Sequence, residues 1–334
     1  MYKFETSTVL FCYRLDRNNI SLLDDDTFRG VGPEMEMVDI SHNRLVKIRL
    51  AIVFRYLSRL RVLRMRYNSL VDIGSPATSD SILPTVLELD LTGNEFHHVP
   101  SKELASLPAL RRLILRDNRI QYIGASAFAS SAFLELVDVG ANRFSRSADG
   151  GPLTIDSQAF CGLEPRALSR SPGVTDWTGL QQVRLDHNGL TQPELCSLMD
   201  IWTLVDVDLS GNPLRCDCRL LAALRRLTDT AVGLRVDRGT QCASPDRLAG
   251  QTVAEAVRHW RLTCSDDSSS HACDAVPCTM PSSLTSSSSS SLSVTGSAVT
   301  VTSCACVFVR ILTWIQPRPR RCTCRTTRLK TPGN

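Results

Sequence analysis

Residues 110–120 read Leu-Arg-Arg-Leu-Ile-Leu-Arg-Asp-Asn-Arg-Ile, and this stretch decides the fold. Leu110, Leu113, Leu115 and Ile120 are apolar at fixed offsets, and Asn118 is set among them. Successive side chains of a β-strand point to opposite faces of a sheet. The stretch therefore predicts a short strand whose Leu113 and Leu115 side chains enter a core, followed by a tight corner at Asn118.

The same pattern of four apolar residues and one asparagine occurs eight times. Its copies begin at residues 10, 35, 60, 86, 110, 134, 180 and 204, so all intervals but one are 24 to 26 residues. An asparagine amide can bond a backbone donor and a backbone acceptor at once, and we expect it to hold each corner. These eight residues, here called the asparagine ladder, are Asn18, Asn43, Asn68, Asn94, Asn118, Asn142, Asn188 and Asn212.

A single repeat of this kind cannot enclose a core, so neighbouring repeats must stack. The sequence resembles leucine-rich repeat proteins over about residues 10–264. The resemblance implies an α/β repeat fold, a solenoid or horseshoe with a parallel β-sheet on its concave side. We expect the repeats within residues 1–214. The one long interval, 46 residues from 134 to 180, predicts insertions at about residues 145–152 and 164–177.

Cysteines follow the eighth repeat. The sequence Asn-Pro-Leu-Arg-Cys-Asp-Cys ends at Cys218, and Cys242 and Cys264 come later, after an apolar pattern with helical spacing. This order resembles the cysteine-rich C-terminal cap of extracellular leucine-rich repeat proteins, here expected over residues 210–264. The resemblance implies disulfides Cys216–Cys242 and Cys218–Cys264. A zinc site is the alternative, although its cysteines are usually roughly two to four residues apart.

Disulfides of this kind persist in oxidising compartments, so the predicted location is the cell surface or the extracellular space. The first nine residues lack the features of a signal peptide, because Lys3 and Glu5 interrupt the apolar residues there. Proteins with this C-terminal cap normally also have a cysteine cap before the first repeat, which this sequence lacks. The expectation is therefore that the true N-terminus lies upstream.

The rest of the chain divides by composition. Residues 265–296 are rich in serine and threonine and predict a linker or stalk, because such a segment cannot build a core. Residues 297–315 are the most apolar stretch, about 28 Å long as a helix, and a basic tail over residues 316–334 follows them. Because Arg310 lies inside the apolar stretch, a single-pass membrane segment and a disordered tail both stay open.

Charge and motifs argue against several function classes. The net charge is +4, but no Asp or Glu follows Asp274, so the basic excess belongs to the tail rather than to the repeats. A nucleic-acid-binding fold therefore has no support. The sequence contains no nucleophile elbow, phosphate-binding glycine loop or His-Glu-x-x-His motif. We expect no enzyme activity, no metal and no other cofactor.

Binding of a protein partner is the expected function, as part of a cell-surface receptor or adhesion protein. A secreted matrix protein without a membrane anchor and a cytosolic leucine-rich repeat adaptor are the alternatives. Polar residues between the core positions line the concave face with charges of both signs, which suits a protein partner better than a simple polyanion. The candidate partner-binding residues are Arg64, Arg66, Glu88, Asp90, Arg112, Ile114, Arg116, Asp138 and Arg184.

Overall fold

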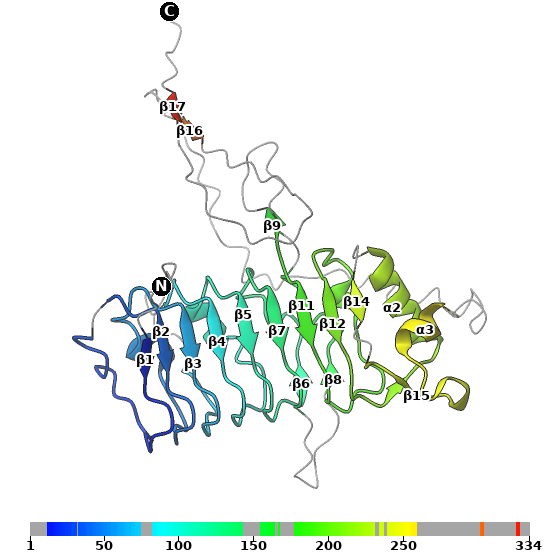
Figure 1. Ribbon diagram of the computed structural model, residues 1–334, viewed down its shortest axis with the longest axis horizontal. Helices are drawn as coiled ribbons and strands as arrows, with labels where there is room; N and C mark the ends of the chain where they lie inside the picture. Colours follow the sequence, from blue (N-terminus) through cyan, green and yellow to red (C-terminus); the bar gives the residue numbers. More distant parts are fainter. Residues whose placement is uncertain are drawn as a thin grey trace, which may run out of the picture. The chain divides into compact units, whose positions relative to one another are not determined.

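The chain forms two compact units, Met1–Pro281 and Ser282–Asn334. The first unit is a solenoid whose strands lie side by side from β1 to β14 (Figure 1). The structure, a computed structural model, describes residues 12–31, 33–74, 82–142, 154–163, 166–167, 177–230, 234–236, 239–258, 301–303 and 325–327.

Nine short strands form one parallel sheet, which confirms the predicted leucine-rich repeat solenoid. Eight of the strands coincide with the eight repeats. The ninth, β14, comes from the chain after the last repeat and pairs with β12. In sheet order the strands are β1 (Cys12–Arg14), β2 (Met37–Asp39), β3 (Val62–Arg64), β4 (Glu88–Asp90), β5 (Arg112–Ile114), β7 (Leu136–Asp138), β11 (Gln182–Arg184), β12 (Asp206–Asp208) and β14 (Arg235–Val236).

Other short elements return the chain from one strand to the next, so that each repeat closes one turn of the solenoid. Among them, β6 and β8 pair in parallel. The return elements are α1 (Leu50–Val53), η1 (Glu103–Ser106), β6 (Tyr122–Ile123), β8 (Thr154–Ile155) and η2 (Cys196–Leu198).

The long interval between the sixth and seventh repeats leaves the sheet unbroken. β7 pairs directly with β11, with Val137 opposite Val183. From the second insertion the structure describes β9 (Arg166–Ala167) and β10 (Trp177–Thr178), which pair antiparallel. Residues 145–152 lie outside the described residues. Because β10 ends just before β11 begins, this pair leaves the solenoid at the edge where the strands start (Figure 1).

A single apolar core runs through the repeats. The centres of the strands from β2 to β12 in the sheet are fully buried and aliphatic, as at Leu113, whereas Tyr13 at the centre of β1 is exposed. Phenylalanines fill the side away from the sheet. Phe28 stacks on Phe54 with ring centroids 5.0 Å apart, and Phe128 stacks on Phe160 at 5.5 Å. Stacked turns thus supply for one another the burial that no single turn could provide.

The C-terminal region closes the last turn. Cys216 is bonded to Cys242, with Cα atoms 5.5 Å apart, and this is one of the two bridges that the resemblance implies. Cys218 is also disulfide-bonded, while Cys264 lies outside the described residues. Helix α2 buries Leu221, Leu224 and Leu227 in the solenoid core. The elements here are β13 (Leu214–Arg215), α2 (Cys218–Thr230), β15 (Cys242–Ser244), η3 (Asp246–Leu248) and α3 (Val253–Arg258).

The second unit contains β16 (Val301–Ser303) paired antiparallel with β17 (Arg325–Thr327). β16 falls within the apolar stretch 297–315, and the rest of that stretch lies outside the described residues, as does 265–296. Within the described ranges, no helix is long and apolar enough to cross a bilayer.

Asn118 shows how the ladder joins one turn to the next. Its Nδ2 donates to the carbonyl oxygens of Leu115 in its own turn and Leu91 in the preceding turn, both at 3.0 Å. Its Oδ1 accepts a hydrogen bond of 3.1 Å from the backbone N–H of Phe96, also in the preceding turn. The same three kinds of bond are made by Asn43, Asn68, Asn94, Asn142, Asn188 and Asn212.

The residue before each ladder asparagine has a left-handed backbone, which the sequence analysis did not predict. A residue with a Cβ is strained there by roughly 1–2 kcal/mol, whereas glycine is not. Gly93 and Gly211 at this offset were the available signal. The eight residues, with φ between 49° and 69°, are Arg17, His42, Tyr67, Gly93, Asp117, Ala141, His187 and Gly211.

Replacing Asn118 by alanine should lower the free energy of unfolding by roughly 3 kcal/mol, because buried backbone groups in two turns lose their partners at about 1–3 kcal/mol each. Urea unfolding followed by circular dichroism measures the change. Asn18→Ala is the matched control, since the Asn18 amide is exposed and, among the residues that the structure describes, bonds only carbonyls of its own turn. Equal losses for the two variants would contradict the role of the inter-turn bonds.

Gly93→Ala should destabilise the protein more than Gly30→Ala does. Both glycines have left-handed φ values, +69° and +84°, so both variants carry backbone strain. A Cβ at Gly93 would also overlap the Tyr67 ring, whereas a Cβ at Gly30 meets nothing within 4 Å. Thermal melts compare the two variants. The loss of stability caused by Gly93→Ala should be smaller when position 67 is glycine than when it carries the Tyr67 ring. A loss that Tyr67→Gly leaves unchanged would rule out the overlap.

Candidate partner-binding face

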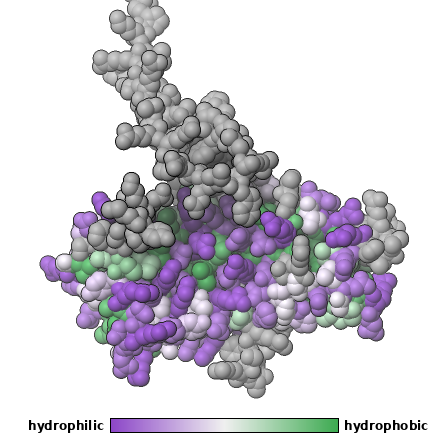
Figure 2. All heavy atoms as spheres, viewed as in Figure 1, coloured by the Kyte–Doolittle hydropathy of each residue, from purple (hydrophilic) through white to green (hydrophobic). Residues whose placement is uncertain are grey.

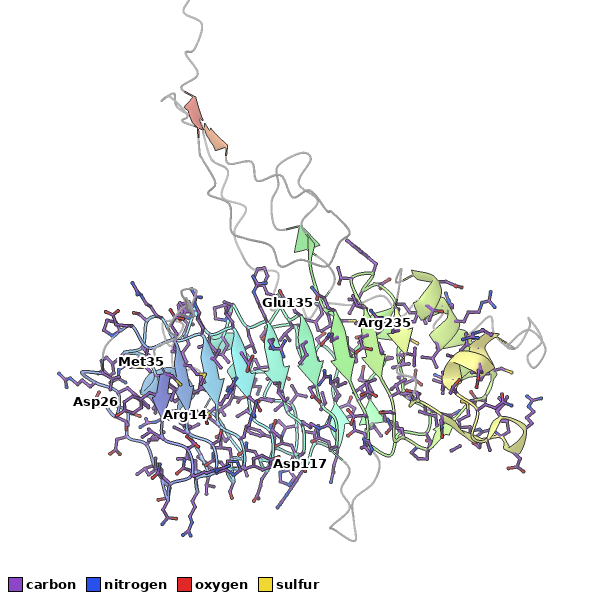
Figure 3. All side chains as sticks on the ribbon, viewed as in Figure 1. Arg14, Asp26, Met35, Asp117, Glu135 and Arg235 are labelled. Carbon is purple, nitrogen blue, oxygen red and sulfur yellow. A yellow bond between two sulfur atoms is a disulfide. The ribbon has the colours of Figure 1, made fainter. Side chains whose placement is uncertain are left out.

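The concave face consists of the side chains on either side of the strand centres, together with the second residue after each strand, such as Arg66, Arg116 and Asp186. Arg14 on β1 and Arg235 on β14 mark its two ends (Figure 3). Glu135 lies at the edge where the strands begin, and Asp117 at the edge where they end. Over the strands the surface is mainly hydrophilic, with scattered hydrophobic residues (Figure 2).

The opposite charges of neighbouring strands meet across the sheet. Glu88 on β4 lies between two arginines, with its carboxylate 3.2 Å from Arg112 Nε on β5 and 3.7 Å from Arg64 Nη2 on β3. Two residues after Glu88 in the chain, Asp90 pairs with Arg66 Nε at 2.6 Å. The basic and acidic side chains of neighbouring strands therefore neutralise one another locally.

Arg116 makes the strongest pair on this face, across an intervening turn. Its two terminal nitrogens donate to both Asp186 oxygens, at 2.8 and 2.6 Å, a bidentate geometry that strengthens the pair. The guanidinium passes directly over Gly140, where an added Cβ would overlap both partners. Asp138 lies beside it, 3.6 Å from Arg116 and 3.8 Å from Arg184. A glycine at position 140 is thus a requirement of the pair.

Burial and pairing shift the ionisation of these groups. Burial raises the pKa of Asp138, although the hydrogen bond from Gly140 N–H and the charges of Arg116 and Arg184 oppose the shift. Burial also raises the pKa of Asp186, but hydrogen bonds from Arg116 and His187 outweigh it and leave that pKa below the usual value. The bond to Asp186 raises the pKa of Arg116 in turn. The Arg116–Asp186 pair is therefore ionised at neutral pH.

The two signs of charge differ in exposure, and this decides what a partner would meet. The paired carboxylates of Asp90, Asp138, Asp186 and Glu88 belong to side chains that are only 1–18% exposed. The arginines above them are 32–50% exposed, and they are Arg64, Arg66, Arg112, Arg116 and Arg184. Guanidinium groups dominate the accessible charge on these turns.

The structure gives the candidate residues two different placements. Asp90 and Asp138 are buried and hold the ends of their strands, accepting hydrogen bonds from the backbone N–H groups of Thr92 at 3.1 Å and Gly140 at 2.9 Å. Ile114 is half-buried. Glu88 is half-buried between Arg64 and Arg112, and the candidate arginines form the outer layer. The sequence analysis left Asp186 out of the candidate residues, because its pairing depends on a contact that skips one turn.

The described residues include no group of three or more histidines, cysteines, aspartates or glutamates placed to hold a metal ion. What the concave face presents is an ordered layer of hydrogen-bond donors on a parallel sheet. Its chemistry is that of binding through charged and polar contacts.

The stacked parallel strands and the asparagine corners form a leucine-rich repeat fold with a disulfide in its C-terminal region. A family model described as "Leucine Rich repeat" matches residues 107–129. The fold is similar to that of human 5T4 (Wnt-activated inhibitory factor 1, trophoblast glycoprotein), with a TM-score of 0.53 and 22% identity over 75% of this chain and 87% of that one.

Relatives by sequence are extracellular or cell-surface leucine-rich repeat proteins. The chain is 28% identical to human lumican over 60% of its own length and 58% of lumican. It is 28% identical to rat leucine-rich repeat and fibronectin type-III domain-containing protein 4 over 53% of its length and 21% of that protein. It is 26% identical to mouse Toll-like receptor 9 over 51% and 17%. The chain thus spans well under two thirds of these relatives.

Arg116→Ala should reduce stability most near neutral pH. The lowered pKa of Asp186 contributes stability while the carboxylate is ionised, and that contribution is lost as the pH falls through the folded-state value, below the ordinary 3.8. The difference in unfolding free energy between parent and variant should therefore shrink in acid. Urea titrations from about pH 7 to about pH 2 measure it, because the contribution declines only below the ordinary pKa of 3.8.

Arg119→Ala is the control for this titration. Arg119 pairs with Glu95 at 3.3 Å, but both side chains are well exposed, and such pairs contribute little. A difference for Arg116→Ala that stays constant over the whole pH range would contradict the stabilising charge pair.

Proposed function

We propose that the chain is an extracellular protein-recognition module of a cell-surface receptor or adhesion protein, which binds a protein partner through the concave face. The observation that carries the proposal is the layer of arginines whose guanidinium groups are fixed by buried carboxylates. Side chains that are already ordered lose little conformational entropy on binding. Arginine is also enriched among residues that dominate protein–protein affinity.

The surroundings of the face support the same proposal. The Cys216–Cys242 bridge suits an oxidising compartment. The relatives support an extracellular recognition role, which fits either a receptor or a matrix protein. A secreted matrix protein without an anchor remains the second candidate. The disulfides disfavour the third, a cytosolic adaptor, because thiols are kept reduced in the cytosol.

A glycan placed on the concave face should block the partner. The double variant Arg112→Asn/Ile114→Thr creates a glycosylation sequon at the middle of the sheet, and Glu88 keeps its contact with Arg64. We expect labelled tetramers of the secreted, glycosylated variant to stain a panel of cultured cells at least about tenfold more weakly than the parent protein, because the glycan covers the central contact residues. Flow cytometry gives the readout, and mass spectrometry checks that the glycan is attached.

The matched control is Lys47→Asn/Arg49→Thr, which places a glycan on exposed residues of the return segment, away from the sheet. Its staining should stay within about twofold of the parent. Loss of staining after mild trypsin treatment of the cells, but not after heparinase, identifies a protein ligand. Unchanged staining with the concave glycan would instead move the site to the insertions around residues 145–177.

A further inference from the structure

We propose that the concave face recognises the side-chain carboxylates of an acidic segment in its partner, and that Arg64 and Arg112 make the principal contact. The inference rests on the proposed function, since it assigns a chemistry to the same face. The ligand group in this proposal is a carboxylate rather than any anion. The reasons lie in how these two arginines are paired.

Arg64 and Arg112 share one carboxylate, and so neither is fully paired. Glu88 is 3.2 Å from Arg112 Nε and 3.7 Å from the Arg64 terminal nitrogen, so a single negative charge serves two guanidinium groups. Arg64 Nε is buried and has no hydrogen-bond acceptor among the described residues. Each guanidinium has five N–H donors, so both arginines keep unpaired donors on an accessible face.

Their neighbours are committed to the fold instead. Arg66 is held by Asp90 at 2.6 Å, and Arg116 is held by both oxygens of Asp186. These carboxylates are buried and would be left uncompensated if a partner drew the arginines away. An incoming carboxylate therefore gains most at Arg64 and Arg112, where the planar fork of donors matches its two oxygens.

The spacing of the accessible arginines fits separate carboxylates along one extended segment. In the sheet order, Arg64 on β3, Arg112 on β5 and Arg184 on β11 occupy every second strand. Neighbouring strands are about 4.8 Å apart, and Arg112 is offset by two residues from the register position that Arg64 and Arg184 share. Successive arginines are therefore about 12 Å apart, which is roughly three to four residues of extended chain. A partner segment lying along the solenoid can thus place one acidic side chain at each.

Local pairing of the charges also disfavours a sulfated polysaccharide as the ligand. Each exposed guanidinium lies over or beside a carboxylate, so the opposite charges largely cancel beyond a screening length of about 8 Å. A sulfated polysaccharide depends on the summed field of many unpaired cations. Short-range hydrogen bonding to individual carboxylates needs no such field.

The test measures binding of fluorescein-labelled hexaglutamate to the full chain by fluorescence anisotropy in near-physiological salt. The variant Arg64→Ala/Arg112→Ala should bind at least about tenfold more weakly than the parent. Arg64→Lys/Arg112→Lys should also lose most of the affinity, because lysine keeps the charge but lacks the planar fork. Melting temperature and gel filtration check that each variant is folded, and the lysine pair answers the question if the alanine pair fails to fold.

The matched control is Arg59→Ala/Arg119→Ala, which removes the same charge from exposed arginines outside the concave face, paired with Glu34 at 3.9 Å and Glu95 at 3.3 Å. Its affinity should stay within about twofold of the parent. Failure of hexaglutamate to bind, or equal losses for the two alanine pairs, would overturn the proposal. So would tighter binding of a heparin hexasaccharide that the Arg64/Arg112 variant abolishes.

The outcome is separable from that of the proposed function. Hexaglutamate binding that needs Arg64 and Arg112, together with cell staining that survives the concave glycan, would sustain the carboxylate site and reject the concave face as the partner's site. If the glycan blocks staining but hexaglutamate does not bind, the concave face stays the partner's site and the carboxylate site is rejected.

Discussion

The bonds that the ladder asparagines from Asn43 to Asn212 make to the preceding turn are the constraint on which the rest of the solenoid depends. Because the strand of each turn is only three residues long, few strand contacts fix the register of one turn against the next. The amide of Asn118 bonds to Leu115 within its turn, and to Leu91 and Phe96 in the turn before, so it sets the register of both. The left-handed residue beside it is strained so that the amide reaches these groups.

Register in turn decides the chemistry of the concave face. With the strands held level, a charge on one strand has its counterpart on the next within ion-pair distance, as at Glu88 and Arg112. The shorter acidic side chains stay near the sheet and bond backbone N–H groups, whereas the longer arginines extend past them. A surface built from charges of both signs can in this way expose mainly one of them.

The sequence predicted the fold because the repeat is a local pattern, and eight copies in one register leave no other arrangement that buries the apolar positions. It also predicted which residues would face outward on each strand. It did not predict that Asp90 and Asp138 would be buried supports, because burial depends on the length of the side chains beside them. Nor did it predict the pairing of Arg116 with Asp186, which needs the absence of a side chain at Gly140.

That pair also shows why the long insertion is compatible with a binding face. Arg116 and Asp186 are 70 positions apart in the chain, yet they meet because Asn188 bonds the carbonyl of Val139 as if the two turns were consecutive. The insertion leaves at the strand edge and does not spread the sheet. Charges from β5, β7 and β11 therefore act as one surface. The ladder fixes the position of this surface and side-chain length sets its accessible sign, so the recognition that we propose there rests on contact geometry rather than on net charge.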